Sequence, residues 1–263
     1  MICSAADAKR VVIKVGTSTL AHSTGLLNIQ RTERLVKVLA DLKNAGKEVI
    51  IVTSGAIGVG MGKAGLKSRP TDIPGKQACA AIGQCELMYC YDKYFSEYNH
   101  SVAQVLLTHD VIDSEVRKQN VINTFRTLLG FGVIPIINEN DTVSVEEIAF
   151  GDNDTLSAIV AALTEADLLI ILSDIDGVYD SNPRKNPDAK LIPHIPAITD
   201  EVRALAGDPG SSLGTGGMIT KFSAAAIALE KDIPVVIMNG SAPERLYELF
   251  EGKQVGTFIG RGE

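Results

Sequence analysis

The sequence predicts an α/β protein, a three-layer αβα sandwich around a mainly parallel central sheet. Short, nearly continuous apolar runs recur along the chain, as they do in strands that are buried on both faces. Stretches of helical periodicity separate these runs, and strands that alternate with helices form parallel sheets. Polar, glycine-rich turns follow several of the runs, at the edge where such sheets bind ligands.

The predicted elements alternate from the N-terminus onward. The strands are RVVIKV (10–15), EVIIVT (48–53), VAQVLL (102–107), VIPIIN (133–138), DLLIIL (167–172) and PVVIM (234–238). The helices are NIQRTERLVKVLADLKNAG (28–46), the stretch 76–97, TLSAIVAALTEA (155–166) and MITKFSAAAIALEK (218–231), with another opening after Ser54-Gly55. Residues 176–208 are rich in Pro, Asp and Asn and are predicted to be irregular.

Composition excludes several functional classes. The 263 residues carry a net charge of −7, which argues against a general nucleic-acid binder. No apolar run reaches the roughly 18 to 20 residues that span a bilayer. The start MICSAADAKR lacks the pattern of a signal peptide and the four cysteines form no CxxC pair, so we expect a cytoplasmic protein without membrane association. No long linker interrupts the chain, so we expect one domain over residues 1–263.

The first two turns combine a positive charge with glycines. Lys14 lies near the end of an apolar strand and is followed by Gly16 and Thr17. A lysine there is costly unless it meets an anion, although an edge strand with Lys14 in solvent stays an alternative. Ser54 and Gly55 follow the second strand and precede a helix, an arrangement suited to a carboxylate or phosphate.

The third turn is rich in amides and carboxylates. Asn138 and Asp141 follow a strand, and Asn153 and Asp154 come just before a helix. One of them could be a helix cap. We expect the asparagines to donate to a carboxylate and Asp141 to accept from an ammonium group, so that together they bind an amino acid.

The fourth turn faces a nucleotide in our interpretation. Ser173 and Asp174 stand at the end of a strand, and the stretch GTGGMITK (214–221) opens an alanine-rich helix. Free N–H groups at a helix N-terminus bind phosphate, although a flexible loop before a helix is the simpler alternative. The candidate residues of this loop are Thr215, Gly216, Gly217, Met218 and Lys221.

The four turns together meet the needs of phosphoryl transfer, which requires mainly positioning and neutralisation of charge. The sequence contains no P-loop, no protein-kinase signature and no dinucleotide fingerprint after the first strand. Spacing alone therefore predicts a small-molecule kinase with an α/β fold. A non-catalytic sensor that has kept the fold is the alternative from another class.

Six motifs, in order along nearly the whole chain, resemble the glutamate 5-kinase family of the amino acid kinase superfamily. They are VVIKVGTSTL, IVTSGAIGVGM, VIPIINENDTV, FGDNDTLSA, LSDIDGVYDSNP and GTGGMITK. The resemblance implies the amino acid kinase fold and transfer of the ATP γ-phosphate to the side-chain carboxylate of L-glutamate, the first step of proline synthesis. Acetylglutamate kinase, aspartokinase and UMP kinase share that fold and are the alternatives within it.

The resemblance also implies roles for single residues. Lys14 and Lys221 would flank the transferring phosphoryl group, and Asp154 would hold both lysines without acting as a base. Ser54, Asp141 and Asn153 match the positions that bind glutamate, to which we add Gly55 and Asn138. The positions that match ATP binding are Ser173, Asp174 and residues 215–221, to which we add Lys14, Gly16 and Thr17. Mg²⁺ is expected on the nucleotide, and no metal site of the protein's own.

The resemblance extends to partners. Members of the family are commonly dimers or tetramers, and we expect a homo-oligomer here. Proline inhibits many members, and whether it does so here stays open; it would act near residues 138–147. The product implies a functional link to glutamate-5-semialdehyde dehydrogenase. Many bacterial members carry a C-terminal PUA domain, which we do not expect in a chain that stops at GTFIGRGE.

Overall fold

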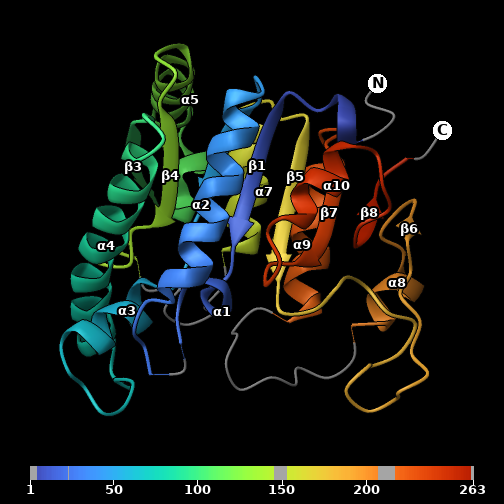
Figure 1. Ribbon diagram of the computed structural model, residues 1–263, viewed down its shortest axis with the longest axis horizontal. Helices are drawn as coiled ribbons and strands as arrows, with labels where there is room; N and C mark the ends of the chain where they lie inside the picture. The colour runs from blue at the N-terminus through green and yellow to red at the C-terminus, as the bar shows by residue number, and fades with distance from the viewer. Residues whose placement is uncertain (1–4, 23, 145–152, 207–216, 262–263) are drawn as a thin grey trace.

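An eight-stranded sheet runs through the centre of the protein in the computed structural model, which describes residues 5–22, 24–144, 153–206 and 217–261 (Figure 1). The strand order is β3-β4-β2-β1-β5-β7-β8-β6. Six strands are parallel: β1 (Arg10–Val15), β2 (Glu48–Val52), β3 (Val102–Leu107), β4 (Ile134–Glu139), β5 (Leu168–Ser173) and β7 (Val235–Asn239). The edge pair, β8 (Thr257–Ile259) and β6 (His194–Ile195), is parallel within itself, and β8 runs antiparallel to β7.

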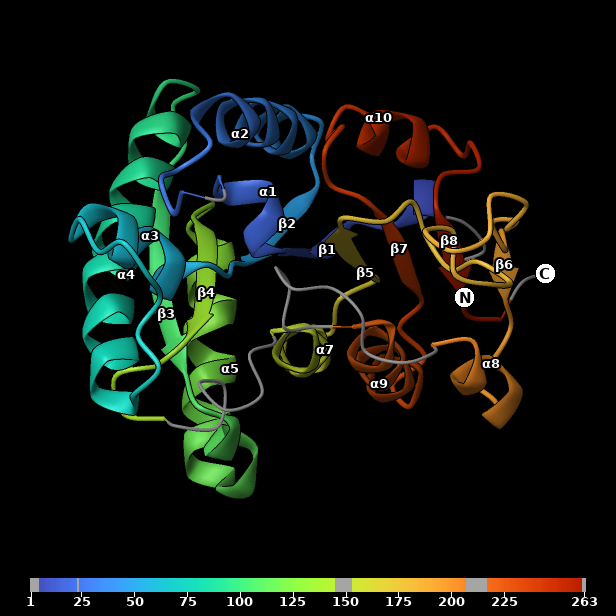
Figure 2. The ribbon, with the colours of Figure 1, turned by 90° about the horizontal axis from the view of Figure 1, so that it is seen from below.

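Helices cover both faces of this sheet (Figure 2). One face carries α2 (Ile29–Asn44), α3 (Ala56–Lys63), α4 (Ile73–Ser96) and α10 (Arg245–Phe250), and the other carries α5 (Glu115–Gly130), α7 (Asp154–Leu163) and α9 (Met218–Leu229). The short elements are η1 (Ala5–Asp7), α1 (Thr17–Leu20), η2 (His109–Asp113) and α8 (Asp200–Ala204). The predicted three-layer αβα sandwich is confirmed. No helix among the described residues has the length and apolar character needed to cross a bilayer.

The two-residue period of β1 divides its side chains between the two layers. Val11, Ile13 and Val15 are buried with α2, α4 and α10, whereas Val12 is buried with α7 and α9. Lys14 shares the face of Val12, because side chains two residues apart lie on the same side of a strand. The strand therefore directs the lysine toward the layer that contains α7 and α9.

The six predicted strands are confirmed, each to within one residue of its predicted ends. The edge strand β6 and its neighbour β8 were not predicted, because runs of two and three residues carry no readable alternation. Residues 176–208, predicted to be irregular, contain β6 and the one-turn helix α8. β6 exists because β8 pairs with it, a long-range cause that composition does not report.

Helices α3 and α4 cross with their backbones in direct contact. A Cβ atom at Gly60 would lie 1.8 Å from the carbonyl oxygen of Cys79, and one at Gly83 would lie 1.8 Å from that of Ala56. Both positions therefore require glycine. The contact places α4 beside the turn at Ser54, because Ala56 is the first residue of α3.

Candidate active site

One buried carboxylate joins two buried lysines at the carboxyl end of the sheet. Lys14 on β1 and Lys221 on α9 are each 6% exposed, and Asp154 at the start of α7 is fully buried. Lys14 Nζ lies 2.7 Å from Asp154 Oδ1, and Lys221 Nζ lies 3.0 Å from Asp154 Oδ2. The structure therefore brings together the three predicted catalytic residues, which are 140 and 67 positions apart along the chain (154 − 14 and 221 − 154).

A threonine completes the surroundings of this carboxylate. Thr220 Oγ1 lies 3.0 Å from Asp154 Oδ2 and 2.7 Å from the carbonyl oxygen of Gly217, so its proton has two acceptors within reach. Thr220 lies within residues 215–221, which are expected to bind ATP, but its contact with Asp154 was not predicted. Its position next to Lys221 in the first turn of α9 was the available signal.

The charges around Asp154 decide its ionisation. Burial alone would raise the pKa of this carboxyl group, but the charges of Lys14 and Lys221 outweigh burial and hold the pKa well below its usual range. Asp154 is therefore a carboxylate at every ordinary pH. Two ammonium groups around one carboxylate leave one net positive charge, which suits an anionic ligand.

The turns after β1 and β2 lie against each other. Gly55 has a φ of +94° and precedes α3, and a Cβ atom there would lie 3.4 Å from Thr17 Cγ2. Ser54 is 9% exposed, and Gly16 precedes α1 with extended backbone. The first two predicted turns thus form one continuous surface beside Lys14.

A chain of buried amides links β4 to the start of α7. Asn153 Nδ2 donates to the carbonyl oxygen of Thr53 and to Asn138 Oδ1, both at 2.6 Å. Asn138 Nδ2 donates to Gln84 Oε1 at 2.9 Å, and Gln84 Nε2 donates to Gln104 Oε1 at 3.2 Å. The structure thus brings Asn138 and Asn153 together and adds Gln84, which the sequence analysis missed.

A cavity of about 390 Å³ adjoins this chain of amides. Its lining includes Ala56 of α3, Ala80, Gln84 and Met88 on one face of α4, and residues 139–142, which include Asp141. Asp141 is 6% exposed, so its carboxylate belongs to the cavity wall rather than to open surface. A mixed wall of this kind fits a small ligand with an aliphatic chain and charged ends.

The predicted nucleotide residues lie at the same edge of the sheet, on β5 and at the start of α9. Ser173 ends β5 and is buried, whereas Asp174 is exposed and forms an ion pair with Arg184 at 2.9 Å. Gly217 immediately precedes α9, and Met218 is the first residue of that helix. Thr215 and Gly216, two further predicted residues, lie outside the described residues, as do residues 145–152 of the third turn.

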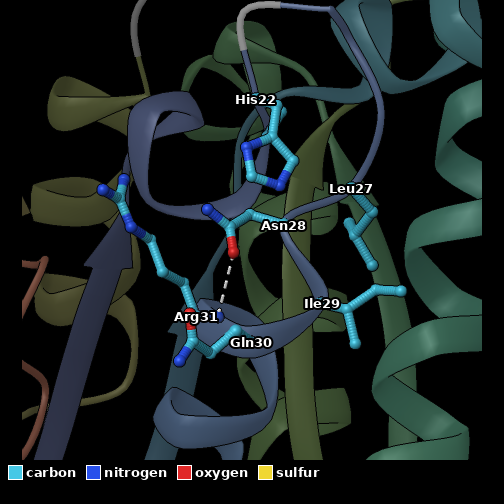
Figure 3. Close-up of a pocket in the computed structure, with 7 residues that line it drawn as sticks. His22, Leu27, Asn28, Ile29, Gln30 and Arg31 are labelled. Carbon is cyan, nitrogen blue, oxygen red and sulfur yellow. Dashed lines mark hydrogen bonds between the residues drawn. The ribbon is translucent and has the colours of Figure 1, made fainter.

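A second cavity, of about 590 Å³, lies at the start of α2 and contains none of the predicted residues (Figure 3). Asn28 Oδ1 accepts a hydrogen bond from the backbone N–H of Arg31 at 3.1 Å, which caps the helix. The side chain of Asn28, which lines this cavity, therefore has a structural role.

The carboxylate at the centre of the site is held by donors of the protein itself. Asp154 is engaged by two ammonium groups and a hydroxyl, and within the described ranges no three His, Cys, Asp or Glu side chains gather as metal ligands. The groups around Asp154 are two ammonium groups and a hydroxyl, which suit an anionic ligand.

The sequence is similar to those of known proteins over nearly its whole length. The profile of the amino acid kinase family matches residues 9–239. The chain is 54% identical over 257 residues to a glutamate 5-kinase of Clostridium perfringens, covering 96% of each chain, and 54% identical to one of Listeria monocytogenes serotype 4a, covering 96% of this chain and 93% of the relative.

Solved structures show the same fold at lower identity. A UMP kinase from Bacillus anthracis superposes with a TM-score of 0.65 at 19% identity, covering 96% of both chains. An isopentenyl phosphate kinase from T. acidophilum gives 0.63 at 18% identity, covering 95% of this chain and 99% of that one. These likenesses concern the fold alone.

Proposed function

The chain belongs to the amino acid kinase family, and within it to the glutamate 5-kinases, and from this premise we propose that it transfers the γ-phosphoryl group of ATP to the side-chain carboxylate of L-glutamate. The product is γ-glutamyl 5-phosphate, the first intermediate of proline biosynthesis. The observation that carries the proposal is the pair of buried lysines held by one carboxylate at the carboxyl edge of the sheet.

The two lysines neutralise the charge of transfer. A carboxylate oxygen of glutamate attacks the γ-phosphorus, and the bond from that phosphorus to the β–γ bridging oxygen breaks, so ADP leaves with the electron pair. Lys14 and Lys221 contact different oxygens of Asp154, which lets their ammonium groups flank the phosphoryl group. Fixed charges in a buried site stabilise this step without reorganisation of solvent.

No general base is required. The side-chain carboxyl of glutamate has an ordinary pKa near 4.3 and is already ionised at neutral pH. Asp154 is engaged by both lysines and has no proton to exchange, so its role is to position them.

The two substrates would enter from neighbouring turns. We assign L-glutamate to the cavity at Asp141, with Ser54, Gly55, Asn138 and Asn153 around it. We assign the ATP phosphates to the turns that contain Gly16, Thr17, Ser173, Asp174 and residues 215–218, with Lys14 and Lys221. Mg²⁺ would be bound together with the nucleotide and would neutralise charge on its phosphates.

The chemistry of the product implies partners. An acyl phosphate hydrolyses readily, so a reductase must consume it promptly, and we assign that role to glutamate-5-semialdehyde dehydrogenase. We further propose a cytoplasmic homo-oligomer of single-domain subunits, with proline as a candidate inhibitor at the amino acid pocket. Sedimentation, and turnover measured with added proline, test the last two points.

The proposed reaction has a direct assay. The protein is incubated with ATP, Mg²⁺ and L-glutamate, and hydroxylamine traps the acyl phosphate as a hydroxamate. Parallel reactions contain N-acetylglutamate, aspartate or UMP. Hydroxamate from L-glutamate alone is the expected result. Preference for another acceptor, or nucleotide binding without turnover of any acceptor, would refute the proposal.

A further inference from the structure

Two backbone groups show which side-chain atom of each buried asparagine is nitrogen and which is oxygen. Asn153 has one side-chain atom 2.6 Å from the carbonyl oxygen of Thr53, and because that oxygen can only accept, the atom is the NH₂ nitrogen. Asn138 has one side-chain atom 3.0 Å from the backbone N–H of Glu139, and because that group can only donate, the atom is the oxygen. Neither amide can be turned over without placing like groups against each other.

The orientation of Gln84 follows from that of Asn138. Since the Asn138 oxygen faces the backbone N–H of Glu139, its nitrogen faces Gln84, which must present its oxygen there. Gln84 is 8% exposed and projects from α4 at the position next to Gly83, where α4 and α3 are in backbone contact. Its location is therefore set by the helix crossing, and it in turn holds Asn138.

Asn153 is left with one unused polar atom, its carbonyl oxygen. Both hydrogens of Asn153 Nδ2 are engaged, by Thr53 and Asn138. Asn153 Oδ1 is buried and has no hydrogen-bond partner among the residues that the structure describes. Asn153 precedes α7, yet it makes no side-chain capping bond, the usual use of an asparagine oxygen at that position. Burying an acceptor without a partner costs free energy unless a ligand donates a hydrogen bond to it.

The location of this oxygen restricts which ligand group can donate a hydrogen bond to it. Asn153 precedes Asp154, which holds the two lysines, and it contacts Asn138, which is followed directly by the residues that line the cavity. The carboxylates of glutamate only accept hydrogen bonds, and the α-ammonium group is its one strong donor at neutral pH. Asn153, which the sequence predicts to donate to a carboxylate, has no hydrogen left to do so.

We propose that Gln84 is a positioning residue for substrate recognition: through Asn138 it fixes Asn153 so that the Asn153 oxygen accepts a hydrogen bond from the α-ammonium group of L-glutamate. The inference rests on the proposed function and deepens it. Gln84 lines the cavity assigned to L-glutamate, and in this proposal it acts through Asn138 and not by contact with the reacting atoms or the nucleotide. Its loss therefore weakens the binding of the amino group and leaves the binding of ATP unchanged.

The test compares a substrate with and without the ammonium group. Gln84→Leu keeps the bulk of the side chain and removes the acceptor for Asn138, and we expect the KM for L-glutamate to rise about 10- to 100-fold, the range for a hydrogen bond to a charged group. The KM for ATP should change by less than about twofold. Glutarate, which has both carboxylates and no ammonium group, is measured as a competitive inhibitor, and its Ki should stay unchanged.

Two further variants separate positioning from damage. Gln84→Glu keeps an oxygen for Asn138, and the exposed Gln104 can turn its amide to donate to the new carboxylate, so the KM for L-glutamate should return toward the wild-type value. Gln119→Leu is the matched control, because it removes a Gln–Asn hydrogen bond of the same 2.9 Å on the surface of α5. It should change neither constant.

The outcomes distinguish the inference from its premise. An unchanged KM for L-glutamate in Gln84→Leu, or an equal loss of L-glutamate and glutarate binding, would overturn the inference and leave the proposed function standing. Gln84→Met, judged by the same two constants, replaces Gln84→Leu if the latter does not melt cooperatively. A wild-type protein that forms no hydroxamate from L-glutamate would overturn the proposed function before any variant is made.

Discussion

Replacing Asp154 with asparagine leaves two buried ammonium groups without their counter-charge. The change keeps the size and shape of the side chain, so packing around α7 is preserved. Lys14 and Lys221, each within 3.0 Å of Asp154, would then repel each other across a neutral amide. The electrostatic cost therefore dominates the result.

The expected loss of stability in Asp154→Asn follows from the burial of the ion pairs. Removing one partner from a buried ion pair costs about 3 to 5 kcal/mol, and here both lysines lose the same partner. At roughly 2 to 4 °C per kcal/mol for a chain of this size, the melting temperature should fall by about 6 to 20 °C. ATP should restore part of it, because its phosphates supply the missing negative charge, and saturation at about 100 times the Kd adds about 2.7 kcal/mol.

The turnover of Asp154→Asn should also fall, for a reason that is separate from its loss of stability. Asp154 sets the separation of the two ammonium groups, and a misplacement of about 1 Å in such a group costs about 100-fold in rate. The assay is hydroxamate formation at saturating substrates, with thermal melts at increasing ATP. Asp110→Asn, the same change in an exposed ion pair with Arg117, is the control and should leave both readouts close to wild type.

The pH dependence has a defined sign. The folded pKa of Asp154 is depressed below its unfolded value of about 3.9, so the stability it contributes is fully present above about pH 4. That stability is lost as pH falls through the folded pKa. The difference between wild type and Asp154→Asn should thus be constant from about pH 5 to 8. An unchanged melting temperature with turnover within about tenfold of wild type would refute this account of Asp154.

Three other substitutions probe the same edge of the sheet. Lys221→Met should lower kcat by about 100- to 1000-fold. It should lower the melting temperature less than Asp154→Asn does, because Lys14 and Asp154 remain a neutral pair. Comparable losses of kcat and of stability would contradict a role of Lys221 in transfer. Gly83→Ala should lower the free energy of unfolding, measured by chemical denaturation, by about 1 to 3 kcal/mol, because the new Cβ would meet the backbone of Ala56. It should also raise the KM for L-glutamate. Wild-type behaviour would show that α3 and α4 can separate freely. Tyr91→Phe removes a buried hydroxyl 3.0 Å from Thr53 Oγ1 and should cost about 1 kcal/mol with kcat unchanged, and a fall in kcat would give that hydroxyl a part in turnover.

The elements that the sequence predicts correctly are those in which local composition and tertiary role agree. β5 is recognisable as a strand because all of it is buried, so residues 168–172 form a continuous apolar run. Lys14 and Lys221 could be selected because a lysine in an apolar strand or in the first turn of an alanine-rich helix has no local explanation. The expectation that Lys14 meets an anion is met within the protein by Asp154.

The parts that sequence reasoning missed depend on contacts between distant segments. Gln84 lies in a helix whose hydrophobic periodicity is weak, and only the fold shows that it faces Asn138, 54 positions away. β6 is a strand because it pairs with β8, and β8 is one because it pairs with both β7 and β6. The hydrogen-bonding direction of Asn153 depends on the carbonyl group of Thr53, 100 positions away, which no local pattern reports.

The backbone contact between α3 and α4 has a mechanical consequence. Because α4 has 24 residues and a rise of about 1.5 Å per residue, it is a rod of about 36 Å, and Gly83 lies near its middle. Two backbone contacts one turn apart, Gly60 with Cys79 and Gly83 with Ala56, hold this rod against α3. A displacement of α4 along its axis must therefore carry α3 with it. Because α3 begins directly after Ser54 and Gly55, such a displacement would also move the turn that follows β2.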